Sequence, residues 1–254
     1  MLRNYFIVAI RNIRKDKFYS LINVFGLMLG IASCILIAIY IQDEISFDRF
    51  NTKADRIYRV IEFIETEGSG ERSSSAPFPT GPTLLEEYSN LIETQVRFFD
   101  FQSPTLLISE KTSEKEFNEP HVLFVDSTFF SIFDYEVTRG DKTTALQKPN
   151  SVLLTESAAK RYFGDEDPMG KLLQIEGRQE LIVTGVMPDA PHNAHFQFEF
   201  LVSFSTLRNF FNGQYPQNWY WNPCWTYLLL KDGVPPGEIE NYFPAFIQKY
   251  FPDF

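Results

Sequence analysis

The stretch LINVFGLMLGIASCILIAIYI, residues 21 to 41, decides the organisation of this 254-residue chain. It contains no charged side chain, and Asn23 and Ser33 are its clearly polar members. An α-helix of this length, rising about 1.5 Å per residue, would cross the roughly 30 Å hydrocarbon layer of a bilayer. A helix in a soluble core normally keeps a wet face, whereas this one is apolar all round. We therefore predict a transmembrane helix over residues 21–41.

Two alternatives to an anchor are a soluble core helix and a cleaved export signal. The sequence from Ile31 to Cys34 (IASC) resembles the box before a lipid-modified cysteine, with small residues where a signal peptidase cuts. However, the apolar run continues to Ile41, and the basic segment before it is about 20 residues long, both unusual in a signal peptide. The balance favours a retained helix.

The charges beside the apolar run predict its direction in the membrane. Residues 1–20 carry five Lys and Arg against one Asp, while Asp43, Glu44 and Asp48 follow the run. Because basic flanks stay on the cytoplasmic side, we expect residues 1–20 inside and the chain after about residue 42 outside.

The first 20 residues also show helical spacing, since apolar side chains recur every three or four positions: Leu2, Tyr5, Phe6, Ala9, Ile10 and Ile13. This pattern predicts an amphipathic helix along the inner membrane surface, with a disordered basic tail as the alternative. Within the apolar run, Gly26 and Gly30 form a small-xxx-small pair. Such a pair lets a second helix approach closely, so we expect helix packing there.

The charge of the remainder excludes some partners. After residue 41, 18 Lys and Arg face 32 Asp and Glu, a formal charge of −14. Such a surface would repel nucleic acid, and it indicates either ordinary solubility or a cationic partner. Cys34 lies in the apolar run and Cys224 outside it, so we expect no disulfide.

The order of patterns after residue 42 predicts an α+β domain. Alternating apolar residues predict strands at 56–65, 94–101, 121–125, 151–154, 196–204 and 225–231, and hairpins at 105–108 with 116–117 and at 172–176 with 180–187. Helices are predicted after Gly81, around Phe129, Phe130 and Phe133 with Asp126 as cap, at 156–163, through Arg208 and at 235–250. We divide residues 42–254 into an outer α+β layer, 55–118 and 196–254, with a β-rich subdomain inserted at about 119–195.

Several blocks of sequence resemble one family in the family's order. NVFGLMLGIASC, QDEISFDRFNTKADRIYRV, SVLLTESAAKRYFGDEDPMGK and VTGVMPDAPHNAHFQFEFLVSF are similar to the first membrane helix and periplasmic core domain of MacB-like and FtsX-like ABC transporter permeases. The resemblance spans essentially the whole chain. The structural positions of the family's motifs match Thr155, Glu156, Ala159, Phe163, Gly164, Pro168, Gly170, Gly185 and His195. Ala194 departs from the serine expected before His195.

This resemblance implies a function in the inner membrane. It implies a permease subunit that passes motion from a cytoplasmic ABC ATPase to the periplasm for efflux, lipoprotein release or activation of cell-wall enzymes. Further partners would be a second permease subunit and a periplasmic adaptor or cargo protein. Three more membrane helices would be expected in such a subunit, so the chain resembles a truncated permease. The alternative is a stand-alone anchored binding module without an ATPase.

The residues indicate little catalytic chemistry. Gly164 to Lys171 (GDEDPMGK) superficially resembles a phosphate loop, but five residues separate its glycines and Leu172 stands where Ser or Thr should be. His192 and His195, with Glu199 as a third group, are a candidate metal site, and the alternative is that the two histidines are polar residues of a loop. Trp219, Tyr220, Trp221 and Trp225 could form either a recognition patch or part of the core. We predict no catalytic residue, cofactor or metal.

Overall fold

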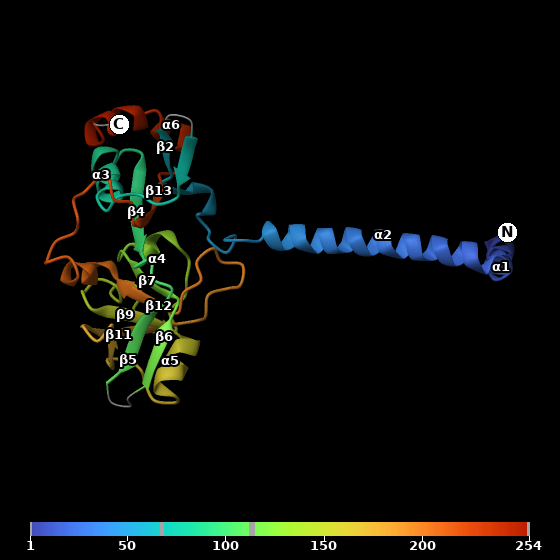
Figure 1. Cartoon of the computed structure of the whole chain (residues 1–254), viewed down its shortest axis with the longest axis horizontal. Coiled ribbons are helices and arrows are strands. Elements are labelled where there is room, and N and C mark those ends of the chain that lie inside the picture. The colour runs from blue at the N-terminus through green and yellow to red at the C-terminus, as the bar shows by residue number, and fades with distance from the viewer. Residues whose placement is uncertain (1, 67–68, 112–114, 253–254) are drawn as a thin grey trace. The chain divides into compact units, whose positions relative to one another are not determined.

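The computed structural model describes residues 2–66, 69–111 and 115–252 (Figure 1). These residues form two compact units, one up to Phe47 and one from Asp48 onward. Each unit is described by itself.

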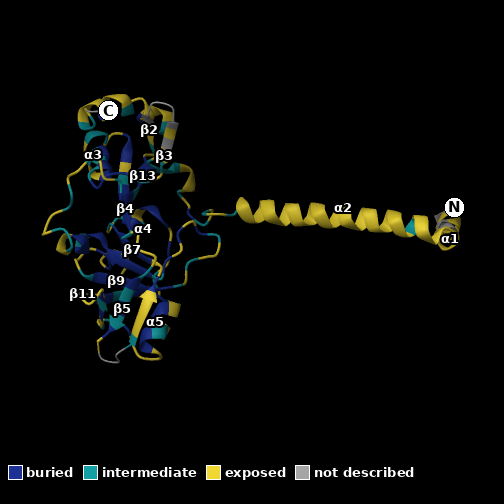
Figure 2. Cartoon of the chain, in the orientation of Figure 1, coloured by how far each residue is buried: buried dark blue, intermediate teal, exposed yellow. Residues whose placement is uncertain are grey.

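The first unit is helical. Helix α1 spans Leu2–Lys15 and α2 spans Lys17–Glu44. Within the described residues, α2 is the one helix long and apolar enough to cross a membrane. None of its residues is buried, as the exposed colouring of Figure 2 shows. This argues against the soluble-core alternative, because a core helix would bury its apolar side chains.

The ends of the first unit's helices carry charge. Arg14 and Lys15 lie in the last turn of α1, while Asp43 and Glu44 end α2. Within α2, the hydroxyl of Ser33 donates to the carbonyl oxygen of Leu29 at 2.9 Å, which satisfies this polar group without water. The predicted helix in residues 1–20 is thus present over Leu2–Lys15, and its position on a membrane surface stays a prediction.

The second unit is an α+β domain, as the sequence predicts. Its strands are β1 (Ile57–Arg59), β2 (Glu62–Thr66), β3 (Ser69–Ser73), β4 (Ile92–Phe99), β5 (Leu106–Glu110), β6 (Lys115–Glu119), β7 (Val122–Val125), β8 (Arg139–Gly140), β9 (Ser151–Thr155), β10 (Leu172–Ile175), β11 (Gln179–Met187), β12 (Phe200–Ser203) and β13 (Cys224–Leu230). Its α-helices are α3 (Thr80–Glu87), α4 (Phe129–Ile132), α5 (Glu156–Phe163), α6 (Pro236–Glu240) and α7 (Phe243–Tyr250). Two 3-10 helices are η1 (Ala54–Arg56) and η2 (Phe204–Asn209).

One mixed sheet organises this unit. Its strand order is β1-β13-β4-β7-β12-β9-β11-β10-β5-β6, with β8 beside β11, while β2 and β3 form a separate hairpin. Strand β7 runs parallel to β12, and β9 parallel to β11; the other pairs along this order are antiparallel. Segments from both ends of the domain therefore meet in adjacent strands.

The central strands are buried on both faces. In β9, Val152 and Leu154 contribute to one apolar cluster and Leu153 to the other. In β4, Phe99 belongs to the first cluster and Phe98 to the second. This explains the near-continuous apolar runs in the sequence, since a half-exposed strand would alternate with polar residues. A third cluster forms between α3, β13 and the C-terminal helices, including Leu84, Leu228 and Phe246.

The start of α5 confirms a prediction made from the sequence. Thr155 is its N-cap, and the Thr155 hydroxyl accepts a hydrogen bond from the Ala158 backbone N–H at 3.2 Å. Gly164 ends the helix with φ 62° and ψ −123°, a backbone conformation that favours glycine. The positive φ agrees with the prediction, although the ψ lies outside the left-handed helical region.

Asp126 does not cap the short helix that follows it, contrary to the sequence prediction. The N-cap of α4 is Thr128, without a side-chain cap bond. The Asp126 carboxylate instead accepts hydrogen bonds from Arg97 on β4. A guanidinium supplies two aligned charged donors, which a carboxylate binds more strongly than one backbone N–H.

Three predicted elements are shorter or divided. The strand over 56–65 is interrupted between β1 and β2, where the Val60 N–H still donates to Thr226. The strand over 196–204 is regular from Phe200 to Ser203. The helix over 235–250 breaks into α6 and α7, with Pro244 in the first turn of α7. Proline lacks the N–H and crowds the preceding turn, so a continuous helix cannot pass through it.

The hairpin of β5 and β6 joins the sheet beside β10. Residues from before 119 therefore share one half of the sheet with residues 151–187. The division into an outer layer and an inserted subdomain at about 119–195 stays a prediction, and the strand order gives both segments one continuous sheet.

Candidate functional site: the connecting segment and its cleft

Residues 48–56, which we name the connecting segment, lead from the start of the second unit into β1. Several bonds tie this segment to loops distant in sequence. The Asp48 N–H donates to the Asn193 carbonyl oxygen at 3.0 Å, and the His195 N–H donates to the Asp48 carboxylate at 2.9 Å. Asp48 itself has φ 57°, a value that Asp tolerates better than most residues. The reciprocal bonds hold this turn in place.

A second group of bonds joins the connecting segment to α4 and to Asp134, which follows that helix. The Thr52 N–H and hydroxyl both donate to the Asp134 carboxylate at 2.6 Å. The Lys53 ammonium donates to the Ser131 carbonyl oxygen at 2.8 Å, and the Asp134 N–H donates to the Asn51 side chain at 2.9 Å. Partial burial alone would raise the pKa of Asp134, but the hydrogen bonds from Thr52 outweigh it and lower that pKa below its usual value.

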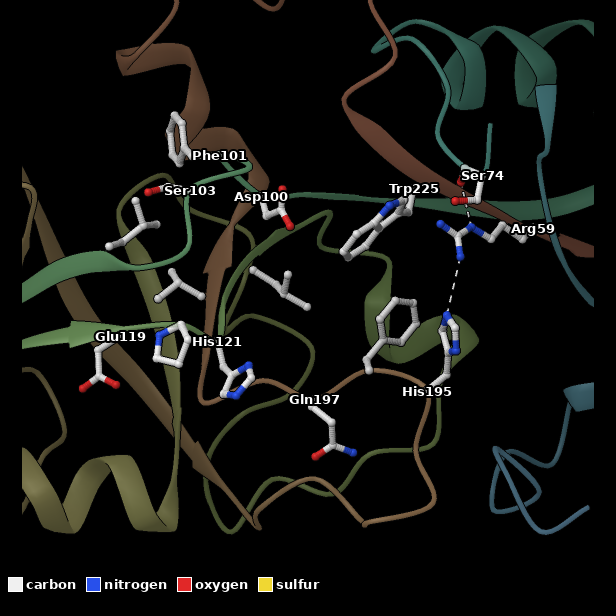
Figure 3. Close-up of a pocket in the computed structure, with 15 residues that line it drawn as sticks. Arg59, Ser74, Asp100, Phe101, Ser103, Glu119, His121, His195, Gln197 and Trp225 are labelled. Carbon is white, nitrogen blue, oxygen red and sulfur yellow. Dashed lines mark hydrogen bonds between the residues drawn. The ribbon is translucent and has the colours of Figure 1, made fainter. Parts of the chain in front are cut away.

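Arg59, at the end of β1, connects this segment to the side chains of the cleft. Its Nε donates to the Ser74 carbonyl oxygen at 2.8 Å, and its Nη1 lies 3.5 Å from Nε2 of His195. The two contacts are drawn as dashed lines in Figure 3. The guanidinium carbon also lies 5.6 Å from the centre of the Trp225 ring, within cation–π range.

These residues line a cavity of about 530 Å³ between β1, β13, the end of β4 and the segments before β7 and β12. Figure 3 labels its polar and aromatic members: Arg59, Ser74, Asp100, Phe101, Ser103, Glu119, His121, His195, Gln197 and Trp225. We name this cavity the polar cleft. Its volume is in the range of small-molecule sites.

The charges around the polar cleft are mixed. Glu119 is engaged by Arg161, whose Nη2 lies 2.9 Å from Glu119 Oε2 and 2.8 Å from Glu199 Oε2. The Tyr162 hydroxyl also donates to Glu119 at 2.9 Å. Burial first, and then the neighbouring Glu119, raise the pKa of Tyr162 above its usual value. Glu119 thus joins α5 to β6, and Arg59, His121 and His195 supply the basic groups of the cleft.

The arrangement can bind and position groups by hydrogen bonds. In the described residues, no group of three or more His, Cys, Asp or Glu side chains could hold a metal ion. Glu199, the third group of the candidate metal site, pairs with Arg161. The structure therefore does not bring His192, His195 and Glu199 together as a metal site.

The sequence-derived site residues of the second unit fall in three places. His195 lies in the polar cleft. Thr155, Glu156, Ala159, Phe163 and Gly164 belong to α5 and its ends, with Pro168 and Gly170 in the turn that follows. Gly185 lies in β11 between β8 and β9, where an added Cβ would lie 3.0 Å from the Arg139 carbonyl oxygen and from Leu153 Cδ2. Its role is close strand packing.

Gly26 and Gly30 lie together on one side of α2. With Cys34 and Ala38 they line a shallow groove, and a Cβ added to either glycine would meet no atom within 4 Å. This leaves room for another helix, and the predicted packing there remains a proposal.

The aromatic cluster divides between core and surface. Trp219 stacks on Tyr250 with ring centres 4.4 Å apart, and Trp225 packs near Phe196. Tyr220 and Trp221 are exposed. Sequence reasoning missed Arg59 and His121 as cleft residues, because β1 and β7 are brought together through the strands between them.

The chain matches one protein family, and two solved structures of related description share its fold. Residues 20–245 match the family described as the MacB-like periplasmic core domain. Among curated proteins nothing matches the chain.

Two solved structures share the fold. One is a domain of a protein assigned as a permease from Porphyromonas gingivalis, with TM-score 0.64 and 21% identity over 79% of this chain and 83% of that one. The other is the periplasmic region of MacB from Actinobacillus actinomycetemcomitans, with TM-score 0.51 and 18% identity over 68% of this chain and 73% of that one.

Proposed function

Because this chain belongs to the family of MacB-like periplasmic core domains, we propose that it is the N-terminal part of an ABC transporter permease of the MacB/FtsX type. In this proposal α2 is an inner-membrane anchor, residues 1–20 are cytoplasmic and the domain from Asp48 onward is periplasmic. The basic residues before α2 and the acidic residues after it support this orientation. ATP hydrolysis would take place in a separate cytoplasmic subunit, and this chain would pass on the resulting motion.

The observation that carries the proposal is the set of hydrogen bonds that holds the connecting segment to the rest of the domain. Motion of a membrane helix can displace the domain as a whole only if the segment that follows the helix is bound firmly to that domain. Residues 48–56 are bound to the end of α4 and Asp134 and to the loop at 193–195 through side-chain and backbone groups, and the segment leads directly into an edge strand of the sheet. The sheet is then hydrogen-bonded from β1 to β6.

The position of the polar cleft supports a role for the connecting segment in passing motion to a bound partner protein. It is lined by Arg59 and His195, which contact each other, and His195 also bonds to Asp48. A partner protein bound in the cleft would contact the same groups that hold the connecting segment. The proposed output is efflux, lipoprotein release or related periplasmic work, through an adaptor or cargo protein.

The groove of Gly26 and Gly30 supports association of two permease subunits. Without side chains at these positions, a second helix can approach the backbone of α2, where packing rather than hydrophobicity drives association in lipid. We therefore extend the proposal to a dimer in which α2 packs through this groove.

Purification of the full-length membrane complex would test the proposal. Spin labels attached to Arg178→Cys in each subunit, in a Cys34→Ser background, would report the separation of the two domains. We expect an ATPase to copurify and the label separation to change on ATP binding and hydrolysis. Asp134→Ala, which removes the acceptor for Thr52, should reduce that change.

The matched control is Asp141→Ala, because the Asp141 carboxylate accepts hydrogen bonds from Thr143 and Thr144 in its own turn. A complex without an ATPase subunit would contradict the proposal and favour a stand-alone anchored binding module. An unchanged label separation through the ATP cycle would contradict the relay of motion.

A further inference from the structure

A second cavity, separate from the polar cleft, is lined by residues of α3, β2, α7 and the loop at 219–222. Figure 1 shows α3 and β2 at the same end of the domain as the C-terminal helices. Its volume is about 500 Å³. The lining is mostly apolar and aromatic: Val60, Ile61, Phe63, Leu84, Trp219, Tyr220, Phe243, Phe246, Ile247 and Phe251. We name it the apolar pocket, and its size and lining are those of a site for a small organic molecule.

Three polar side chains interrupt this lining: Glu62, Thr80 and Asn222. The Asn222 amide donates to the Glu62 carboxylate, which fixes its NH₂ on that side and leaves its oxygen as an acceptor. Among the described residues, Asn222 Oδ1 and Thr80 Oγ1 are buried without a hydrogen-bond partner. Thr80 is only 4% exposed, so water has little access to it.

A buried polar oxygen without a hydrogen-bond partner destabilises the folded state, because it has lost its contacts with water. The polar groups here offer more acceptors than donors, because the ionised carboxylate and the amide oxygen only accept, whereas the Thr80 hydroxyl can donate one hydrogen bond as well as accept. The deficit is met by a ligand group with several N–H bonds. An ionised carboxylate such as that of Glu62 binds a charged N–H donor more strongly than a neutral one.

We propose that the apolar pocket binds an amine carried on a compact apolar body, with the ammonium group directed to Glu62, Asn222 and Thr80. The apolar body would contact Leu84, Trp219 and Phe246. Two ring contacts support a preformed wall, since Trp219 and Phe246 have ring centres 5.7 Å apart and Trp219 also stacks on Tyr250. Exposed Ile61, Phe63 and Ile247 form the rim, through which such a molecule would enter.

Burial makes the ionised form of Glu62 less favourable, and a bound ammonium group would oppose this effect. Burial raises the pKa of Glu62 to about 7, against a smaller lowering by Asn222. Tyr220 is the other titratable side chain of the lining. An ammonium group beside Glu62 would stabilise its ionised form, as the Asn222 donor does to a smaller extent.

The binding test uses the full chain in lipid nanodiscs at about pH 8, where 2-phenylethylamine is protonated. The matched probes are 2-phenylethanol, which keeps the body without the charge, and 3-phenylpropionate, which reverses the charge. Calorimetric titration should give tighter binding for the amine than for the alcohol and weaker binding for the carboxylate. Glu62→Gln should lower the affinity for the amine at least about tenfold and the affinity for the alcohol by less than about twofold, because only the amine loses a charged hydrogen bond.

Two further variants separate pocket binding from other causes. Glu240→Gln makes the same change on exposed α6 outside the pocket, so it should leave amine affinity unchanged. Ile247→Trp places a larger side chain at the entrance of the pocket and should lower the affinity for all three probes. Equal amine affinity in Glu62→Gln and Glu240→Gln, or binding of the carboxylate as tight as the amine, would overturn the proposal. Thermal unfolding of Glu62→Gln, expected at or above the wild-type temperature, checks that lost binding is not lost folding.

Discussion

Arg97 and Asp126 form a buried two-point ion pair that joins β4 to the chain just after β7. Arg97 Nε lies 2.8 Å from Asp126 Oδ2, and Nη2 lies 2.9 Å from Oδ1. The third guanidinium nitrogen donates to the Phe78 carbonyl oxygen at 2.8 Å, and the group lies over the Phe204 ring. Burial alone would lower the pKa of Arg97, but the Asp126 charge outweighs it and raises that pKa. The pair therefore fixes two central strands in register.

Asp126→Ala should destabilise the domain strongly. It leaves the Arg97 charge buried and unpaired, and breaking a buried pair in this way typically costs about 3–5 kcal/mol. Chemical denaturation followed by circular dichroism measures the loss. Asp165→Ala, an exposed carboxylate elsewhere in the same domain, should change stability by less than about 0.5 kcal/mol. A similar effect of the two substitutions would show that the pair does not hold the strands.

Thr155→Ala should weaken the start of α5. The change removes the hydroxyl that accepts from the Ala158 N–H, and loss of such a cap typically costs about 1 kcal/mol. Thr155→Ser keeps the hydroxyl and should recover most of the stability. Thermal unfolding of the three proteins measures both effects, and equal melting of the Ala and Ser variants would argue against the cap.

Glu62 should make stability depend on pH. Its pKa is raised from 4.5 to about 7 in the folded chain, so its contribution is fully present below about pH 4.5 and is lost as pH rises through about 7. Because the side chain is only partly buried, we discount the effect to about 1–2 kcal/mol. Glu62→Gln should therefore be more stable than the wild type at about pH 8, with the difference shrinking towards about pH 5. Denaturation at several pH values measures this difference, and a pH-independent difference would be inconsistent with the raised pKa.

Cys34 should report the packing of α2. It lies in the same groove as Gly26 and Gly30, whereas Cys224 is buried in the domain. Oxidation in membranes should thus crosslink two chains through Cys34 if the groove is a dimer contact. Replacing Gly26 and Gly30 with leucine should abolish the crosslink by separating the helices. Leu29→Ala, outside the residues lining this groove, serves as the control and should keep it.

The predictions that the structure confirms concern elements whose form depends on residues close to each other in the sequence. The apolar run from Leu21 to Ile41 is helical because a chain segment without charges and with helix-forming side chains needs no distant partner to define it. Thr155 and Gly164 begin and end α5 through bonds to residues within four positions. Asp126 failed as a predicted cap because a partner 29 residues away, Arg97, binds its carboxylate instead.

The sequence by itself determined the membrane-length helix, the α+β class and the family, since these depend on local periodicity and on motifs that stay in order along the chain. The tertiary structure alone decided that β5 joins β10, that Arg59 meets His195 and that Glu62 lies in an apolar pocket beside Asn222. These contacts join residues 63 to 160 positions apart, and their energies depend on strand order and burial, which no local pattern specifies.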